Sequence, residues 1–225
     1  MEINKLFKII STITLSGIMF IGCGDEKVTF KGLEYKVITS PITGKKWLDR
    51  NLGASQACTS STDRACYGDY YQWGRLADGH EKTSSNITTT LANDISDIGN
   101  RFVVGYKDWT SADTKGDIRK VQWSKIDGTG ICPVGFRVPT QIELKAETDE
   151  IFLKLPLSGT RDIYGSIFAL DIAGDLWTNS VNGLYSQSKF RSYTESASAN
   201  PLINSLMDLL YGYRAYGIPV RCIKD

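Results

Sequence analysis

The sequence has little histidine and no excess of charge of either sign. One of its 225 residues is histidine, and 26 basic residues stand against 25 acidic ones. Proteins that bind nucleic acid show a basic excess gathered on one face, so this balance gives no support for a nucleic-acid partner. The single histidine, His80, lies in the polar stretch "ADGHEK". This setting predicts a surface histidine rather than a general base.

Motifs of common enzyme classes are also missing. No G-x-S-x-G nucleophile elbow occurs, which argues against a hydrolase of that class. A zinc site needs cysteines at CxxC-type spacing, and no cysteine pair here has that spacing. The sequence therefore predicts no catalytic residue, no metal and no cofactor.

The N-terminus has the pattern of a signal peptide. Two lysines precede an apolar stretch over residues 9–21, which is too short for a comfortable membrane span. Gly22 then provides a small residue directly before Cys23, as a cleavage site requires. Removal of residues 1–22 would take away one acidic and two basic side chains and leave 24 of each sign.

The sequence "FIGC", which ends at Cys23, resembles the lipobox of bacterial lipoproteins. The resemblance implies that Cys23 receives a diacylglyceryl thioether, becomes the new N-terminus and is then acylated, for example with palmitate. Several acyl chains anchor a protein stably where one does not. We therefore expect the outer membrane as location, contact with the membrane only through the lipid, and a lipidated tether over residues 23–33. An acidic pair at 25–26 resembles the signals that send some lipoproteins to the cell surface, and a plain secretory peptide is the alternative.

The other four cysteines are an even number in a chain predicted to be exported, which indicates disulfides. Of the three possible connectivities we predict Cys58–Cys66 and Cys132–Cys222, because the first pair is local and brackets the polar loop "TSSTDRA". The loop-entropy relation gives the short bridge about 2.6 kcal/mol and the long one about 4.6 kcal/mol.

Hydrophobic patterns predict a few short elements and one long irregular region. Residues 34–39 and 46–51 read as a hairpin around a Pro and Gly turn. Residues 67–77 place aromatic side chains at helical spacing and predict a short amphipathic helix. Residues 78–130 are rich in Ser, Thr, Asp, Asn and Gly, show no sustained period, and are predicted to form a long loop region.

The C-terminal half contains clearer start signals. In "CPVGFRVPTQIELK" the order T-x-x-E at Thr140 and Glu143 is a capping box, which predicts that a helix begins there. Apolar runs in "FLKLPLSGTRD" and "GDLWTNSV" suit short strands. Residues 200–212 predict a helix that ends at Gly212, and residues 217–225 predict a half-buried strand that Pro219 restricts to an edge or a strand start.

Several of these segments occur in one known order: "KKWLDRNLG", "YGDYYQWGR", "CPVGFRVPTQIEL", "LPLSGTRD", "GDLWTNS" and "GIPVRCIKD". Together they resemble the FISUMP (major paralogous) domain family of bacterial surface lipoproteins, over residues 34–225. The resemblance implies a C-type-lectin-like α+β fold, with a small twisted antiparallel sheet, two or three helices and long irregular loops. It also supports the bridge from Cys132 to the last strand at Cys222.

"FRVPTQIEL" further resembles a segment of formylglycine-generating enzymes and of other proteins of the lectin-like class. Enzymes and non-enzymes share this segment, so we interpret Thr140 and Glu143 as structural capping residues. Calcium-dependent lectins of this fold use EPN or QPD together with WND, and only "WTNS" at residues 177–180 is similar to the second element. The missing acidic partner makes calcium-mediated sugar binding an unfavoured hypothesis, with Trp177 predicted to fill the core.

Aromatic side chains of the long loop region are the remaining ligand-binding candidates. Tyr106, Trp109 and Trp123 would suit stacking against a glycan or a protein, although large aromatics also dominate cores. Our first hypothesis is a cell-envelope lipoprotein whose domain is a non-enzymatic recognition or adhesion module for a glycan or surface protein. The alternatives are an enzyme or enzyme remnant of the formylglycine-generating type, and a structural envelope protein without a specific ligand.

Overall fold

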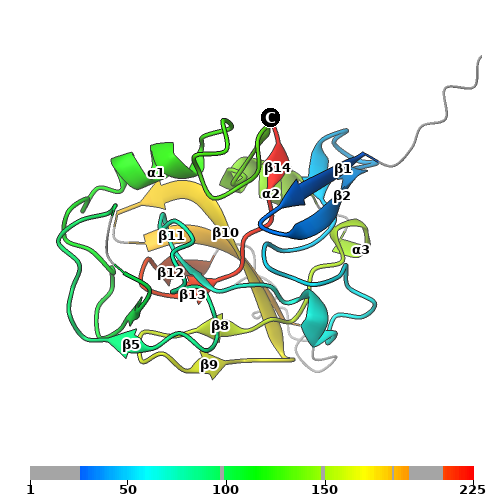
Figure 1. The fold of residues 1–225 in the computed structure, drawn as a ribbon. Coiled ribbons are helices and arrows are strands. Elements are labelled where there is room, and N and C mark those ends of the chain that lie inside the picture. Colours follow the sequence, from blue (N-terminus) through cyan, green and yellow to red (C-terminus); the bar gives the residue numbers. More distant parts are fainter. Residues whose placement is uncertain (1–25, 97–98, 148–149, 184, 193–209) are drawn as a thin grey trace, which may run out of the picture.

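Strands make up most of the regular structure. The computed structural model describes residues 26–96, 99–147, 150–183, 185–192 and 210–225. Within these ranges the protein is of mixed α+β class, with short helices and a curled antiparallel sheet (Figure 1), as the sequence predicted at this level. The elements are β1 (Lys27–Phe30), β2 (Leu33–Thr39), β3 (Lys46–Leu48), the 3-10 turn η1 (Arg64–Cys66), β4 (Tyr71–Gln72), β5 (Ile87–Thr88), β6 (Phe102–Val103), α1 (Asp117–Trp123), β7 (Phe136–Arg137), α2 (Gln141–Ala146), α3 (Glu150–Leu153), β8 (Thr160–Arg161), β9 (Ile167–Phe168), β10 (Ala173–Asn182), β11 (Tyr185–Ser192), β12 (Leu210–Tyr213), β13 (Gly217–Ile218) and β14 (Ile223–Lys224).

A five-stranded sheet brings the first and last described strands together. Its order is β1-β2-β3-β14-β7. The predicted hairpin is confirmed, because β2 and β3 pair antiparallel with Val37 opposite Leu48. The two ends of the described chain therefore lie in one sheet, although most of the chain separates them in sequence.

Strand β1 falls within residues 23–33, which we predicted to be a tether, and this part of the prediction is wrong. β1 pairs antiparallel with β2, with Phe30 opposite Leu33. The two residues between them, Lys31 and Gly32, both have positive φ, at 48° and 79°. Two-residue hairpin turns of this type need positive φ at both central positions, and Lys-Gly is a weaker sequence signal for them than Asn-Gly.

The C-terminal segment divides between two sheets instead of forming one edge strand. β13 lies between β4 and β8 in the sheet β4-β13-β8-β9, and β14 lies between β3 and β7. The prediction of an edge or a strand start is wrong, because β13 and β14 each have a neighbour on both sides and Pro219 falls between them, where it removes no ladder hydrogen bond. Arg221 also departs from the prediction of a half-buried strand, because its exposed fraction is 0% although arginine is usually a surface residue.

The helix predicted over residues 67–77 is absent. This stretch contains turns and strand β4, and Gly68 and Gly74 within it have positive φ, at 78° and 76°, which interrupts any helix. The aromatic side chains on the predicted apolar face are nevertheless buried, since Tyr70 is 2% and Trp73 0% exposed. The spacing therefore indicated burial correctly and the element type wrongly.

Two further helix predictions need correction. The long loop region contains a helix, α1, which begins after Gly116 without a side-chain cap and so gives no sequence start signal. A Cβ at Gly116 would lie 2.7 Å from Arg214 Nη2, so close packing excludes the usual capping residues there. The helix predicted to end at Gly212 is contradicted at its end, where Leu210–Tyr213 is strand β12. Its residues 200–209 lie outside the described ranges.

The helices α1 and α2 both pack against β10, and the largest core cluster joins residues of α1, β10 and several other strands (Figure 1). It contains Trp73, Trp123 and Trp177, each 0% exposed. The structure contains both predicted disulfides. Cys132–Cys222 lies in this cluster and joins the turn before β7 to the segment before β14. Cys58–Cys66 lies in a separate small cluster beside the polar loop that it closes.

Candidate functional site

The long loop region of residues 78–130 is the part of the chain where a ligand site was predicted, and its tryptophans are interior. Trp109 and Trp123 are 0% exposed, so the prediction that they form a stacking surface is wrong. Their indole Nε1 groups donate to backbone oxygens, Trp109 to Trp73 at 2.7 Å and Trp123 to Arg75 at 3.2 Å. Tyr106 is 38% exposed, and its hydroxyl donates to the Thr89 carbonyl at 2.9 Å. Only the tyrosine is accessible to a ligand.

Buried arginines hold this region from inside. Arg119 is 0% exposed and donates to both carboxylate oxygens of Asp108, at 2.6 and 2.7 Å. Arg214, from the far end of the chain, reaches the same carboxylate at 3.1 Å. Two arginines on one aspartate form a charge-assisted, largely desolvated network, and Arg119 is held in addition by Asp113 at 3.3 Å. Segments around 108, 119 and 214 are thereby fixed to one another.

The same guanidinium groups lie over the buried tryptophan rings. The Arg119 guanidinium carbon is 5.3 Å from the Trp73 ring centre and 5.1 Å from that of Trp109, and Arg214 is 4.9 Å from Trp73. Cation–π contacts of this kind are strongest when the cation is desolvated, as here. The rings and the arginines therefore form one interior scaffold beneath the irregular chain.

Arg75 extends the scaffold to the first part of the loop region. It is 1% exposed and donates to the carbonyls of Gly99 at 2.7 Å and Arg101 at 2.9 Å. Its Nε also donates to Asp78 at 2.9 Å. Backbone oxygens that would otherwise be unpaired in a loop are satisfied in this way.

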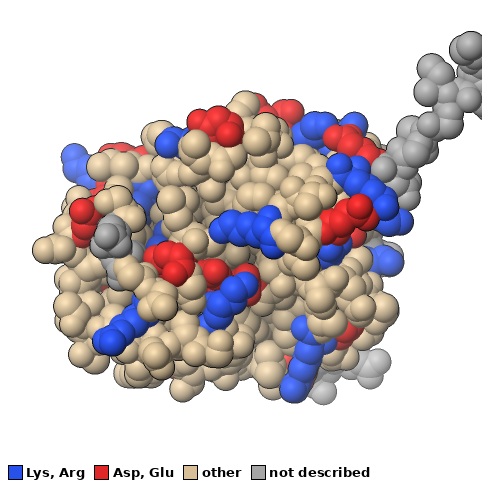
Figure 2. All heavy atoms as spheres, viewed as in Figure 1, with Lys and Arg blue, Asp and Glu red and all other residues tan. Residues whose placement is uncertain are grey.

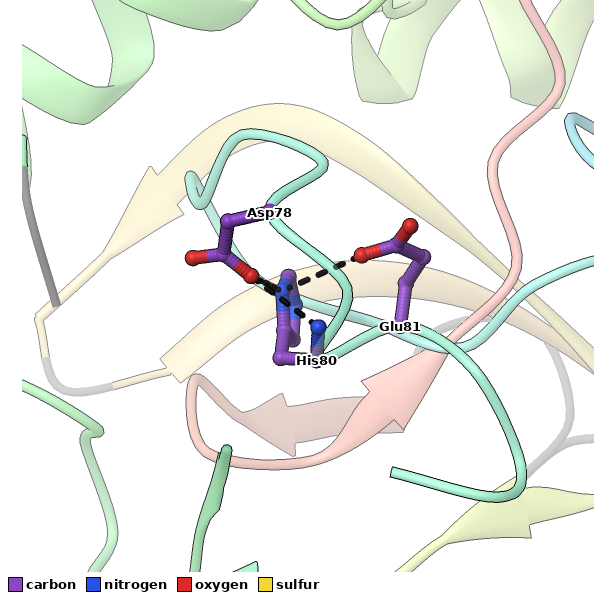
Figure 3. A group of neighbouring side chains, drawn as sticks. All are labelled: Asp78, His80 and Glu81. Carbon is purple, nitrogen blue, oxygen red and sulfur yellow. Dashed lines mark hydrogen bonds and ion pairs between the residues drawn. The ribbon is translucent and has the colours of Figure 1, made fainter. Parts of the chain in front are cut away.

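His80 lies inside the protein, and our prediction of a surface histidine is wrong. It is 0% exposed, and Figure 3 shows Asp78 and Glu81 on either side of its ring. The backbone amide of Gln72 donates to Nε2 at 3.0 Å, so Nε2 is the unprotonated nitrogen. Nδ1 then carries the proton and donates to Asp78 Oδ1 at 2.7 Å. Burial lowers the pKa of His80 to about 4, which keeps the ring neutral.

Asp78, His80 and Glu81 are also the group in the described part of the chain whose spacing would suit a metal ion, with ligand atoms within 4.8 Å of one another. A metal would need the lone pair of Nδ1. Because the Gln72 amide donates to Nε2, the ring's lone pair lies on Nε2 and is already used. Nδ1 carries the proton and has no lone pair for a metal. The His80 ring is therefore held by hydrogen bonds that fix the loop, and neither of its nitrogens is free to bind a metal or to act as a general base.

Thr140 and Glu143 form the predicted capping box. The Glu143 amide donates to Thr140 Oγ1 at 3.2 Å, and the Thr140 amide donates to Glu143 Oε2 at 2.8 Å. Arg137 donates to both oxygens of Glu143, at 2.8 and 2.7 Å, and mainly this contact lowers the pKa of Glu143 to about 2. The carboxylate is thus fully engaged in starting α2 and tying it to β7.

We expect Thr140→Ala to lower the free energy of unfolding by about 1 kcal/mol, because it removes one cap acceptor. Urea unfolding measures the change. Ile142→Ala is the matched control, since Ile142 lies on the same helix and is 81% exposed. A Thr140→Ala protein with unchanged stability but without a ligand that the wild type binds would instead place Thr140 in a binding site.

The segment around Trp177 is part of the core, as predicted for that tryptophan. Trp177 is 0% exposed and its Nε1 donates to the Tyr71 carbonyl at 2.7 Å. Asn179 is 3% exposed and donates to Ser124 Oγ at 3.0 Å, which links β10 to the end of α1. The residues similar to the second calcium-lectin element are therefore committed to packing.

The chain was compared with protein-family models, with curated proteins and with solved structures, and none of them matches it. Across the ranges that the structure describes, no helix combines the length and the apolar character needed to cross a membrane. Cys23, the predicted lipidation site, lies outside those ranges.

Proposed function

We propose that this protein is a cell-envelope lipoprotein, anchored to the outer membrane through Cys23. Its domain is of the FISUMP, C-type-lectin-like type and acts as a non-enzymatic recognition or adhesion module. The ligand is a glycan or a surface protein, and the loop region of residues 78–130 presents the binding surface.

The observation that carries this proposal is the interior scaffold of the loop region. Arg75, Arg119 and Arg214 are each at most 1% exposed and bind loop carbonyls or Asp108 from beneath. A loop that is held in one conformation loses little conformational freedom when a ligand binds. An irregular surface on a rigid frame is the arrangement typical of recognition domains.

Two further features support the proposal. The side chains best suited to nucleophilic or acid–base chemistry serve the fold, since four cysteines form disulfides and both ring nitrogens of His80 are engaged. The lectin-like architecture is supported by the shared sheet of β1 and β14 and by the bridge from Cys132 to Cys222.

A glycan and protein array tests the proposal, with the full-length chain applied in a detergent that has no sugar headgroup. We expect binding to a restricted set of glycans or proteins. A silent array would instead favour a structural envelope protein. Turnover of a peptide thiol in an assay with metal supplementation would favour the formylglycine-generating alternative.

Replacement of Cys23 tests the anchor separately. We expect Cys23→Ser to abolish incorporation of a labelled fatty acid and retention in the membrane fraction, because serine lacks the thiol that would form the thioether. Cys58→Ser is the control, since its loss opens a disulfide and leaves the lipobox intact. A Cys23→Ser protein that still incorporates the label would contradict the lipoprotein assignment.

A further inference from the structure

A pocket opens where the β1–β2 hairpin meets the start of the loop region. It has a volume of about 80 Å³. This is room for a few water molecules, or for part of a ring-sized group that enters from solvent. Tyr35 and Leu52 form part of its wall, each 1% exposed, and the half-buried ring of Phe30 lies at the hairpin end.

Glu81 offers an unused acceptor to this pocket. The side chain is one of the lining residues, yet Glu81 is only 5% exposed. Its Oε2 accepts from the Gly79 amide at 2.8 Å, and its Oε1 accepts from no donor among the described residues. Solvent reaches Oε1 through the pocket, so a hydroxyl group of a ligand can take the place of a water molecule as its donor.

Asp69 supplies a second acceptor. Its Oδ2 accepts from Lys82 Nζ at 2.6 Å, and its Oδ1 has no donor within the described ranges. Burial is the main cause that raises the pKa of Asp69. Gly53 leaves the space for this carboxylate, since a Cβ there would lie 2.1 Å from Asp69 Oδ2.

Lys31 supplies a donor at the rim. Its Nζ lies 5.6 Å from the Phe30 ring centre, and no carboxylate in the described part of the chain forms an ion pair with it. Burial lowers its pKa, while the charge of Glu81 acts in the opposite direction. The two lysines and two carboxylates that line the pocket sum to zero charge. Figure 2 likewise shows acidic and basic side chains intermixed on the face that carries the β1–β2 hairpin.

We propose that this pocket binds one neutral, polyhydroxylated ring, a monosaccharide unit of a glycan, through hydroxyl groups that donate to Glu81 and Asp69. The inference rests on the proposed recognition function and names the ligand class and the place. Zero net charge gives no long-range attraction for an ion, whereas free acceptors, a free ammonium donor and an aromatic ring beside them match the hydroxyls and the C–H face of a sugar. The positive charge beside the two carboxylates comes from Lys82 and Lys31. A calcium ion is not needed to balance the carboxylates, so we expect sugar binding to be independent of calcium.

Saturation-transfer NMR and calorimetry test the pocket, with the full-length chain in the same detergent. The probes are glucose, galactose, mannose and N-acetylglucosamine, with lysine as a charged comparison. We expect at least one sugar to bind with a Kd on the order of 1 mM, which is typical of a ligand held by a few hydrogen bonds. The Kd should be unchanged by a chelator, and lysine should not compete.

Two variants locate the binding. Glu81→Gln removes the charge that strengthens the hydroxyl contact and keeps the side-chain shape, and Phe30→Ala removes the ring. Each should weaken sugar binding by about tenfold. Phe168→Ala is the matched control, because Phe168 is an aromatic residue of another short strand with 45% exposure, outside the pocket lining. Unfolding curves of all three variants show whether Glu81→Gln folds, and if it does not, Phe30→Ala decides.

The outcomes separate the pocket from the general function. If both variants bind the sugar as tightly as the wild type does, the proposal that this pocket binds it is wrong. The general proposal of glycan recognition is then unaffected. Binding of lysine in place of sugars, or array signals for proteins only, also overturns the pocket. A chain that binds no sugar and no protein overturns the proposed function and the pocket with it.

Discussion

Removal of the Cys132–Cys222 disulfide, by the double substitution Cys132→Ala and Cys222→Ala, should lower the free energy of unfolding by about 4.6 kcal/mol. The bridge joins residues 90 apart in sequence, and the cost of closing a loop in the unfolded chain grows with its length. Both cysteines are at most 1% exposed, so the substitutions also leave space in the largest core cluster. Domains of this size are stable by only ~5–15 kcal/mol, so this loss brings the chain near unfolding.

The second disulfide is the internal control for this result. Cys58 and Cys66 are 8 residues apart, and the corresponding double alanine variant should lose about 2.6 kcal/mol. Urea unfolding at one pH measures both. Equal losses, or a larger loss for the short bridge, would contradict the loop-closure explanation.

Replacement of Asp175 by asparagine should make the protein more stable at pH 7 and above. Asp175 is 8% exposed; its Oδ2 accepts from Thr160 Oγ1 at 2.5 Å, and its Oδ1 has no partner. Burial raises the pKa of Asp175 to about 7. The folded state thus favours the neutral carboxyl, whereas the unfolded chain ionises it above about pH 4. This group contributes stability that is fully present below pH 4 and lost as pH rises toward 7.

The size of the effect follows from the same shift. About three pKa units at 1.36 kcal/mol each give an upper limit of about 4 kcal/mol between pH 4 and 8. Urea unfolding of wild type and Asp175→Asn across this range should give a difference that grows up to pH 7 and then levels. Glu34→Gln is the control, since Glu34 is an exposed carboxylate paired with Lys27. A difference independent of pH would show that Asp175 is ionised throughout.

Local signals in the sequence predicted the parts of the fold that depend on neighbouring residues. The capping box at Thr140 and Glu143 needs only a spacing of three, and the helix begins where it indicates. The disulfide pairing followed from one short polar loop between Cys58 and Cys66. The β2–β3 hairpin followed from a turn between two strand patterns.

The interior of the loop region was not predictable in this way. Arginine is usually exposed, so nothing in its own neighbourhood marks Arg119 or Arg214 as buried. Their shared partner Asp108 is 11 residues from one and 106 from the other. The burial of His80 was missed as well. Its neighbours in the sequence are polar, whereas the ring of Phe102, which packs against its ring, is 22 residues away.

The candidate pocket combines four segments that are remote in sequence. Phe30 and Lys31 come from the hairpin, Leu52 and Gly53 from the turn after β3, Asp69 from the segment before β4, and Glu81 from the loop after it. No binding motif marks these residues in the sequence: Asp69 was placed in the helix predicted over residues 67–77, and Glu81 in the polar loop region. Their convergence is a property of the sheet order, which sequence patterns of single elements do not contain.

The position of β1 sets how far the domain can stand from the membrane if Cys23 carries the lipid. β1 begins at Lys27, so three residues separate the anchor from folded structure. Four steps of extended chain at ~3.3–3.6 Å each reach about 14 Å. β1 adds about 10 Å before Phe30 and the pocket. The pocket would therefore lie within about 25 Å of the lipid headgroups. It could bind only ligands that are anchored in the same membrane or lie close to its surface.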